Sequence, residues 1–171
     1  ERIAVNVSII QLREENFAQR VLEILEEVHL DPAYLELEIT ESQTLNLQQV
    51  KPQIKALRNR GVKFAIDDFG TGFASLNHLR FMGFDTIKID KGYIHNIVTN
   101  NRDRVIVSSI LNMANLLQLR IIAEGVETGD QWEYVKQMDI SEVQGYYCSP
   151  PVDKERIEQL LKEKGSKTSG E

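Results

Sequence analysis

This chain of 171 residues contains one cysteine, three histidines and no long apolar segment. Because Cys148 has no second cysteine, the sequence excludes an internal disulfide and a metal site built from paired cysteines. A single unpaired cysteine also favours a reducing, cytoplasmic environment. The histidines, His29, His78 and His95, are widely spaced and form no pair typical of zinc ligands. We therefore interpret them as structural or surface residues.

The longest apolar stretches are far shorter than the roughly 20 residues that a transmembrane helix needs. The chain also begins without a charged and then apolar leader, so we expect neither a membrane segment nor a signal peptide. A formal net charge of −6 disfavours a nucleic-acid polymer as partner, because binding a polyanion requires clustered lysine and arginine. The phosphate-binding pattern GxxxxGK[ST] and the nucleophile pattern GxSxG are both missing.

What the chain does contain is a sixfold alternation of strand-like and helical segments. Each strand-like run is rich in β-branched residues and ends in an acid or an amide; the runs are residues 3–6, 35–41, 64–68, 87–90, 121–124 and 143–144. Apolar residues at helical spacing indicate helices between them, over residues 17–28, 50–57, 105–116, 132–138 and 154–163. We expect Ile106, Ile110 and Met113 to form the apolar stripe of the third helix, and Asp153 to cap the last.

This alternation predicts a parallel α/β fold, and polar groups at every strand end favour a TIM-type (β/α) barrel over an open sheet. A closed barrel of eight units typically needs about 200 residues or more. We therefore expect an incomplete barrel of about six β/α units, with the first strands missing. Residues 1–164 would form the C-terminal portion of one barrel domain, and residues 165–171 would form a flexible polar tail.

Acidic side chains gather where the predicted strands end, and in a parallel barrel these ends open onto one mouth. Asp67 and Asp68 close one run, and the turn sequence FGTG follows them. At the end of a strand one carboxylate can bridge two cations while its neighbour binds one. A DD pair on its own is more often a helix cap in a solvated loop, so this motif alone leaves both roles open.

Three further runs supply oxygen ligands. Glu38 suits a hard cation, whereas Glu41 can anchor a neighbouring loop or cap the helix that follows. Glu124 ends its apolar run and is the better ligand of its segment, with Glu127 behind it. Asn6 offers a neutral oxygen, although an asparagine at a strand end is more often a turn residue.

Lys88 lies between two isoleucines, inside a strand that should be buried. A lysine in that position needs an anionic partner. Near an acid-lined mouth it could orient or help deprotonate an attacking water, or stabilise charge that develops on a phosphate. The alternative is a structural ion pair with Asp90 or with a neighbouring aspartate.

Taken together, these segments resemble the EAL domain family, the phosphodiesterases that hydrolyse bacterial cyclic di-GMP. The resemblance covers nearly the whole chain and follows the order of the family's motifs. The matching segments are VNVS at residues 5–8, EITES at 38–42, DDFGTG at 67–72 with Ser75 and Leu76, KID at 88–90, AEGVE at 123–127 and QGY at 144–146.

The resemblance implies a site with two Mg²⁺ or Mn²⁺ ions that hydrolyses cyclic di-GMP to linear pGpG. It assigns five metal ligands, of which Asp67 bridges the ions; they are Asn6, Glu38, Asp67, Asp68 and Glu124. The catalytic residues would be Lys88, which contacts the nucleophilic water, with Glu124 and Asp67. Gln144, Glu127 and Tyr146 would bind substrate. Glu41 would hold the loop of residues 69–76, which in the family couples dimer contacts to metal binding.

The sequence departs from the family at one important point, because the EAL signature with its metal-binding glutamate would precede residue 1. We therefore expect the fragment itself to be impaired. The alternatives are a non-catalytic cyclic di-GMP receptor on the same fold or, less favoured, another metal-dependent barrel enzyme such as a lyase. The family also implies a homodimer, with GGDEF, PAS or receiver domains in the parent chain.

Overall fold

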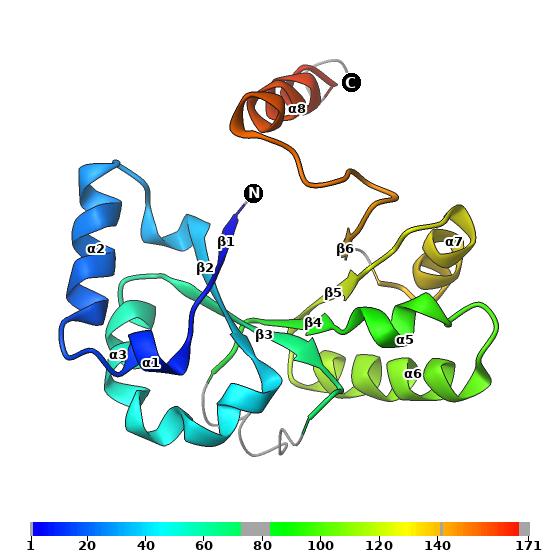
Figure 1. Ribbon diagram of the computed structural model, residues 1–171, viewed down its shortest axis with the longest axis horizontal. Helices are drawn as coiled ribbons and strands as arrows, with labels where there is room; N and C mark the ends of the chain where they lie inside the picture. The colour runs from blue at the N-terminus through cyan, green and yellow to red at the C-terminus, as the bar shows by residue number, and fades with distance from the viewer. Residues whose placement is uncertain (1, 73–82, 141, 168–171) are drawn as a thin grey trace.

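A computed structural model describes residues 2–72, 83–140 and 142–167, with the side chains of residues 45–48 and 164–167 left out of the description. Ser75, Leu76, His78 and residues 168–171 therefore lie outside the described residues. Six parallel strands form one sheet in chain order (Figure 1). The strands are β1 (Ile3–Asn6), β2 (Leu35–Thr40), β3 (Lys63–Phe69), β4 (Thr86–Ile89), β5 (Arg120–Glu124) and β6 (Glu142–Gln144). All six predicted runs are confirmed as strands.

Helices follow the strands, as the alternation predicts. They are α1 (Ile9–Leu12), α2 (Phe17–Glu27), α3 (Lys51–Arg58), α5 (Lys91–His95), α6 (Asn101–Leu116), α7 (Gly129–Gln137) and α8 (Lys154–Lys167), with the 3₁₀ segments η1 (Pro32–Tyr34) and η2 (Glu41–Gln49). The side chain of Asp153 accepts a hydrogen bond from the Arg156 amide at 2.9 Å, as expected of an N-cap. Helix α8 runs to Lys167 and so includes three residues that we expected in the tail. Among the described residues no helix is long and apolar enough to cross a membrane.

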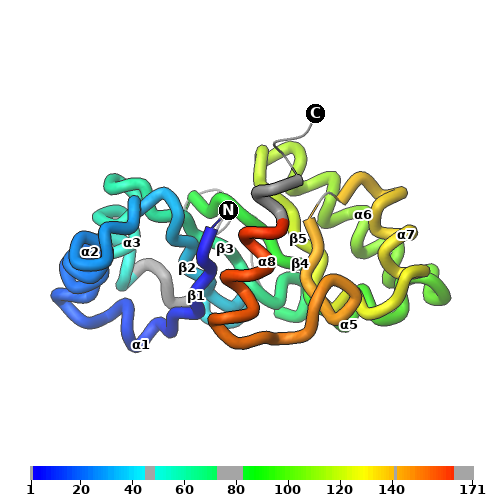
Figure 2. The backbone as a smooth tube through the Cα atoms, turned by 90° about the horizontal axis from the view of Figure 1, so that it is seen from above, coloured from blue at the N-terminus to red at the C-terminus, as the bar shows by residue number. Residues whose placement is uncertain are grey.

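Over the residues that the structure describes, the sheet curls into a half-barrel and does not close. In the described residues β1 pairs with β2 alone and β6 with β5 alone, so the curl has two free edges. Helices α2 and α3 flank β1 to β3, whereas α5, α6 and α7 flank β4 to β6 (Figures 1 and 2). The structure thus confirms an incomplete TIM-type barrel.

The hydrophobic core lies between the sheet and these helices. From the strands it takes Phe64, Ile66, Ile87 and Ile89, all fully buried. From α6 it takes four residues; they are Val107, Ile110, Leu111 and Ala114. The predicted stripe is therefore only partly right, since Ile110 is central while Ile106 and Met113 pack at the margin of the core.

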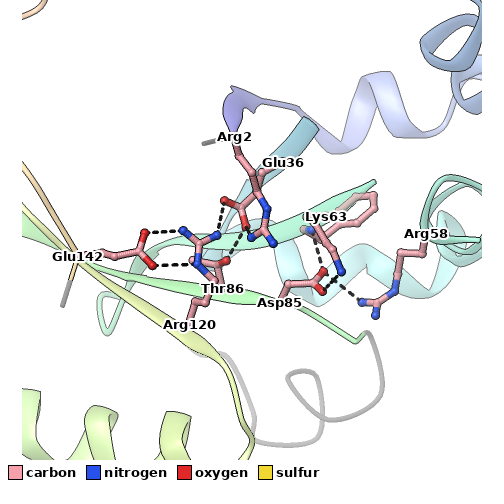
Figure 3. Close-up of polar contacts among 9 residues, drawn as sticks. Arg2, Glu36, Arg58, Lys63, Asp85, Thr86, Arg120 and Glu142 are labelled. Atoms are coloured by element: carbon pink, nitrogen blue, oxygen red, sulfur yellow. Dashed lines mark hydrogen bonds and ion pairs between the residues drawn. The ribbon is translucent and has the colours of Figure 1, made fainter. Parts of the chain in front are cut away.

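The other face of the sheet is polar. Along β2, Leu35, Leu37 and Ile39 join the core while Glu36 and Glu38 alternate with them and are also buried. At the start of the strands, Arg120 contacts Glu142 and lies 3.5 Å from Glu36, which accepts a hydrogen bond from the Thr86 hydroxyl at 2.5 Å (Figure 3). Arg2 lies 3.6 Å from the same glutamate. We call these five residues, Arg2, Glu36, Thr86, Arg120 and Glu142, the basal cluster.

Candidate metal and substrate site

Lys88 is the centre of a second polar group, at the opposite ends of the strands. Its side chain is only 3% exposed, and its Nζ lies 2.7 Å from Glu124 Oε1, 2.9 Å from Glu38 Oε1 and 3.2 Å from Asp67 Oδ1. The lysine on β4 therefore joins the ends of β2, β3 and β5. Asp90 has a different role from these three acids: its carboxylate accepts a hydrogen bond from the Gly92 amide at 2.8 Å and so caps the N-terminus of α5.

Burial and charge act against each other at this site. Burial alone would lower the pKa of Lys88, but hydrogen bonds to Glu124 and Glu38 and the charges of both carboxylates outweigh it, so the pKa lies above its ordinary value. Burial raises the pKa of Glu124 to about 7 although Lys88 opposes the shift, and burial likewise raises the pKa of Glu38. One lysine therefore does not offset all the crowded carboxylates, and this environment favours an additional cation.

Three carboxylates lie close enough together to share a cation. Asp67, Asp68 and Glu124 each offer an oxygen, and these oxygens all lie within 4.8 Å of one another. In the part of the chain that the structure describes, they form the one such group of three or more acidic, histidine or cysteine side chains. We call this group the carboxylate cluster.

Adjacent strand residues normally point to opposite faces, so the meeting of Asp67 and Asp68 needs a local cause. The pairing of β3 with β4 shifts register between Ile66 and Phe69. Asp68 has a φ of 53°, in the left-handed region that aspartate tolerates better than most residues. This irregularity interrupts the alternation and brings both carboxylates to the same mouth.

Glu41 lies outside the carboxylate cluster. Its buried Oε2 accepts hydrogen bonds from the amides of Gly70 and Gly72, each at 2.8 Å. Asn6 is exposed on β1 and pairs in register with Glu38 on β2, so it lies at the same end of the sheet as the lysine group. Residues 73–76 of the predicted loop lie outside the described residues.

A cavity of about 570 Å³ opens beside the carboxylate cluster. Asp68 and Glu124 line it together with the three residues expected to bind substrate; these are Glu127, Gln144 and Tyr146. Gln144 pairs in register with Glu124 across β5 and β6. Lys91 also lines the cavity, which brings one basic side chain among the carboxylates.

A model of the EAL domain matches residues 1–151. The chain belongs to the EAL domain family. This EAL domain is 38% identical to the cyclic di-GMP phosphodiesterase NbdA of Pseudomonas aeruginosa over 162 residues, which are 94% of the chain and 21% of that protein. The chain therefore spans about a fifth of the length of this curated relative.

Solved EAL structures share its architecture. The MucR phosphodiesterase of Pseudomonas aeruginosa in complex with c-di-GMP matches with a TM-score of 0.86 and 34% identity, over 91% of this chain and 64% of that one. A complex of Klebsiella pneumoniae BlrP1 with manganese and cy-diGMP matches with a TM-score of 0.81 and 30% identity, over 85% of this chain and 38% of that one. These likenesses agree with an EAL barrel that is incomplete.

The sequence alone did not reveal two parts of this EAL domain. The first is the basal cluster, although the strict alternation of leucine and glutamate in β2 was a signal for a polar inner face. The second is Tyr93 on α5, whose hydroxyl donates a hydrogen bond to the carbonyl of Gly70. Because that partner is a backbone atom 23 residues away, no sequence pattern could have identified the contact.

Proposed function

We propose that this EAL domain hydrolyses cyclic di-GMP to linear pGpG with two bound divalent cations, Mg²⁺ or Mn²⁺. The observation that carries the proposal is the carboxylate cluster at the edge of the 570 Å³ cavity, with the Lys88 amine against two of its three members. The names of NbdA and of the MucR complex support cyclic di-GMP as the substrate.

The residues present suit such cations. Asp67, Asp68 and Glu124 would hold them, with Glu38 and Asn6 contributing from the ends of the neighbouring strands. Carboxylate and amide oxygens are the ligands that hard divalent ions prefer. When bound, such ions supply an activated water at neutral pH and stabilise the charge of the phosphate during in-line displacement. They would also favour the charged form of Glu124, whose pKa is raised by burial and, to a lesser degree, by the charge of Asp67.

Lys88 would act as a hydrogen-bond donor. Its hydrogen bonds to Glu124 and Glu38 favour the charged ammonium form, which donates hydrogen bonds and accepts none. A charged Lys88 can orient the attacking water and stabilise negative charge on the phosphate. These roles are therefore favoured over removal of a proton from the water. Its contacts with Glu124 and Asp67 would hold the amine beside the reacting phosphate.

The cavity would hold the nucleotide. Glu127 and Gln144 offer polar groups on the side of Glu124, and the exposed ring of Tyr146 offers an aromatic surface against which a base can stack. These residues would orient the phosphodiester toward the carboxylate cluster, which is how an enzyme converts binding into a favourable attack geometry.

We further propose that the domain acts as a homodimer in the cytoplasm, within a longer signalling protein that carries GGDEF, PAS or receiver domains. The chain matches only 21% of the length of NbdA, which supports a parent protein with further domains. The barrel domain would comprise residues 1–164, and α8 continues beyond it to Lys167.

The second candidate is a non-catalytic receptor for cyclic di-GMP. The observation that favours it is the cavity, because Glu127, Gln144 and Tyr146 line a space that suits a nucleotide whether or not the nucleotide is hydrolysed. Such a protein would bind the nucleotide tightly without turning it over.

The test uses the chain together with the natural sequence that precedes it. The protein is incubated with cyclic di-GMP and Mn²⁺, and pGpG is followed by chromatography. We expect product from the unmodified protein, none after EDTA treatment and none from Asp67→Asn. Glu133→Gln, an exposed acid on α7, is the matched control and should retain activity. Binding without product would instead identify a receptor.

A further inference from the structure

The turn that follows Asp67 and Asp68 is held from two sides. On one side, Glu41 accepts the amide of Gly70. On the other side, the Tyr93 hydroxyl on α5 donates to the carbonyl of the same residue. Gly70 is therefore held through both its N–H and its C=O, by side chains from two separate elements.

The ring of Tyr93 also fits closely against this turn. Gly70 has a φ of 104°, which only glycine adopts readily. A Cβ atom at Gly70 would lie 2.6 Å from Cε2 of the Tyr93 ring, so the backbone passes directly beside the ring edge. The position of the tyrosine thus limits the path that the turn can take.

Helix α5 brings this contact close to the chemistry. It follows β4, the strand of Lys88, after the single residue Asp90. The Asp90 amide donates to the Phe69 carbonyl at 3.3 Å, which ties the start of α5 to the end of β3. The Tyr93 hydroxyl adds a second tie two residues after Asp68. The element that follows the lysine is thereby joined to the turn that carries the two aspartates.

We propose that Tyr93 is a positioning residue for the divalent cations: through Gly70, its hydroxyl holds the turn that sets Asp68 beside Asp67 and Glu124. The inference rests on the proposed function, because it requires cations at the carboxylate cluster. In a looser turn the Asp68 carboxylate samples more positions. Binding a cation then costs additional conformational entropy, because the carboxylate must be fixed in one position. Cation affinity falls as a result, while the binding of cyclic di-GMP to the loaded site changes little.

The test is Tyr93→Phe, which keeps the ring and removes only the hydroxyl. Mn²⁺ binding is measured directly, by electron paramagnetic resonance of the free ion, without nucleotide. We expect affinity to fall about three- to tenfold, which corresponds to one net hydrogen bond. At saturating Mn²⁺ the KM for cyclic di-GMP should stay within about twofold of the unmodified protein. Tyr34→Phe is the matched control, because Tyr34 is half exposed on η1, at the opposite end of the strands.

A double-mutant cycle separates positioning from general stabilisation. Because Glu41 and Tyr93 hold the same residue, the losses of Mn²⁺ affinity in Glu41→Gln and Tyr93→Phe should not add in the double variant. Equal Mn²⁺ affinity in Tyr93→Phe and Tyr34→Phe would overturn the inference, as would additive losses. If the unmodified protein binds Mn²⁺ but forms no pGpG, only the proposed hydrolysis is overturned, because the role of Tyr93 is tested by Mn²⁺ affinity. An unmodified protein that binds no Mn²⁺ would overturn both.

Discussion

Lys88 is the structural partner of three acids and, in the proposed mechanism, also a hydrogen-bond donor to the phosphate. A lysine buried without partners would lose its proton, because burial disfavours the charged form. Here Glu38, Asp67 and Glu124 keep the amine charged, and the amine in turn allows three acids to meet in a poorly solvated mouth. The excess of negative charge that remains is what makes the site receptive to cations.

Replacing this lysine should separate the two roles. We expect Lys88→Met to destabilise the metal-free protein by about 3 kcal/mol, since it leaves buried carboxylates unpaired. That corresponds to a fall in Tm of about 6 to 12 °C for a chain of this size. Added Mn²⁺ should recover more of the Tm in the variant than in the unmodified protein, while pGpG formation stays lost. Thermal melts with EDTA and with Mn²⁺ test this.

Lys91→Met is the control for that series, because Lys91 is exposed and lines the cavity. Its Tm should stay close to that of the unmodified protein with and without metal. Equal Tm values for Lys88→Met and Lys91→Met would contradict the view that the buried amine offsets the carboxylates.

At the residue scale, sequence reasoning worked where position on a strand decides proximity. Asp67 on β3 and Glu124 on β5 lie on either side of β4 at the same end of one parallel sheet, so their approach follows from the fold class. Asp68 joins them only through the left-handed turn and the shift in register, which no residue pattern specifies. The choice between the two roles of Glu41 likewise depended on where the Gly70 amide came to lie.

At the scale of elements, the turn between β5 and α7 depends on one glycine. Gly125 has a φ of 68°, and a Cβ atom there would lie 2.5 Å from the Cβ of Lys91 on α5. The close approach lets α5 pack directly against the residue that follows Glu124. The turn therefore couples the position of this carboxylate to the packing of a helix.

Gly125→Ala should accordingly be costly. The left-handed conformation costs an alanine about 1 to 2 kcal/mol, and the contact with Lys91 adds to it. We expect the Tm to fall by at least about 4 °C, measured by circular dichroism. Gly129→Ala is the matched control, because a Cβ atom there would make only an ordinary contact, 3.8 Å from the Tyr147 ring. A Tm for Gly125→Ala equal to that of Gly129→Ala would rule out this account.

The basal cluster makes the stability of the folded protein depend on pH. The hydrogen bond from Arg120 lowers the pKa of Glu142 below its ordinary value, so the folded state favours the carboxylate. This contribution is present above the ordinary glutamate pKa of about 4.3 and is lost as the pH falls through the lower, folded value. Glu142→Gln should therefore lower the Tm by a few degrees at pH 7, and the difference should shrink below about pH 4.

Melting curves across that range, with Glu133→Gln as a matched acid-to-amide control on the exposed face of α7, measure the effect. A difference between Glu142→Gln and the unmodified protein that stays constant from pH 7 to acid would show that the ion pair contributes nothing to the pH dependence.

The elements themselves were largely predictable. Residues 3–6 were expected as a strand, and β1 has those bounds, because β-branched residues ending in a polar group are a strong local signal. The short helix α5 was not expected, since its five residues are too few to show a helical period and Asp90 provides its cap. Likewise, the reach of α8 into Gly165 runs against the local preference of glycine for turns.

At the scale of the whole molecule, the six strand-like runs predicted the strands and the chain length predicted an incomplete barrel, whereas neither predicts how the open edges behave. On β1, Ile3 is 55% exposed and Val5 is 44% exposed to solvent. In the described residues β1 pairs with another strand, β2, on one side alone. Helix α8 stands apart from the other helices, beyond the irregular residues 145–153 (Figure 1), and exposes Ile157 and Leu161. A half-barrel therefore presents unpaired backbone groups beside apolar side chains, which is a template for pairing with another chain.

We expect the 171-residue chain to self-associate through β1. Val5→Lys places a charge on this edge strand, a device by which natural sheets prevent edge pairing. In sedimentation velocity, the variant should shift from larger species toward the monomer. Leu116→Lys is the control, because Leu116 is 86% exposed at the end of α6 and the substitution removes an even more exposed apolar side chain away from any strand edge. Equal shifts in the two variants would mean that general hydrophobicity drives the association, and a monomeric unmodified chain would mean that the open edge is harmless. If Val5→Lys alone restores the monomer, the free edge of β1 is the surface through which the half-barrel associates.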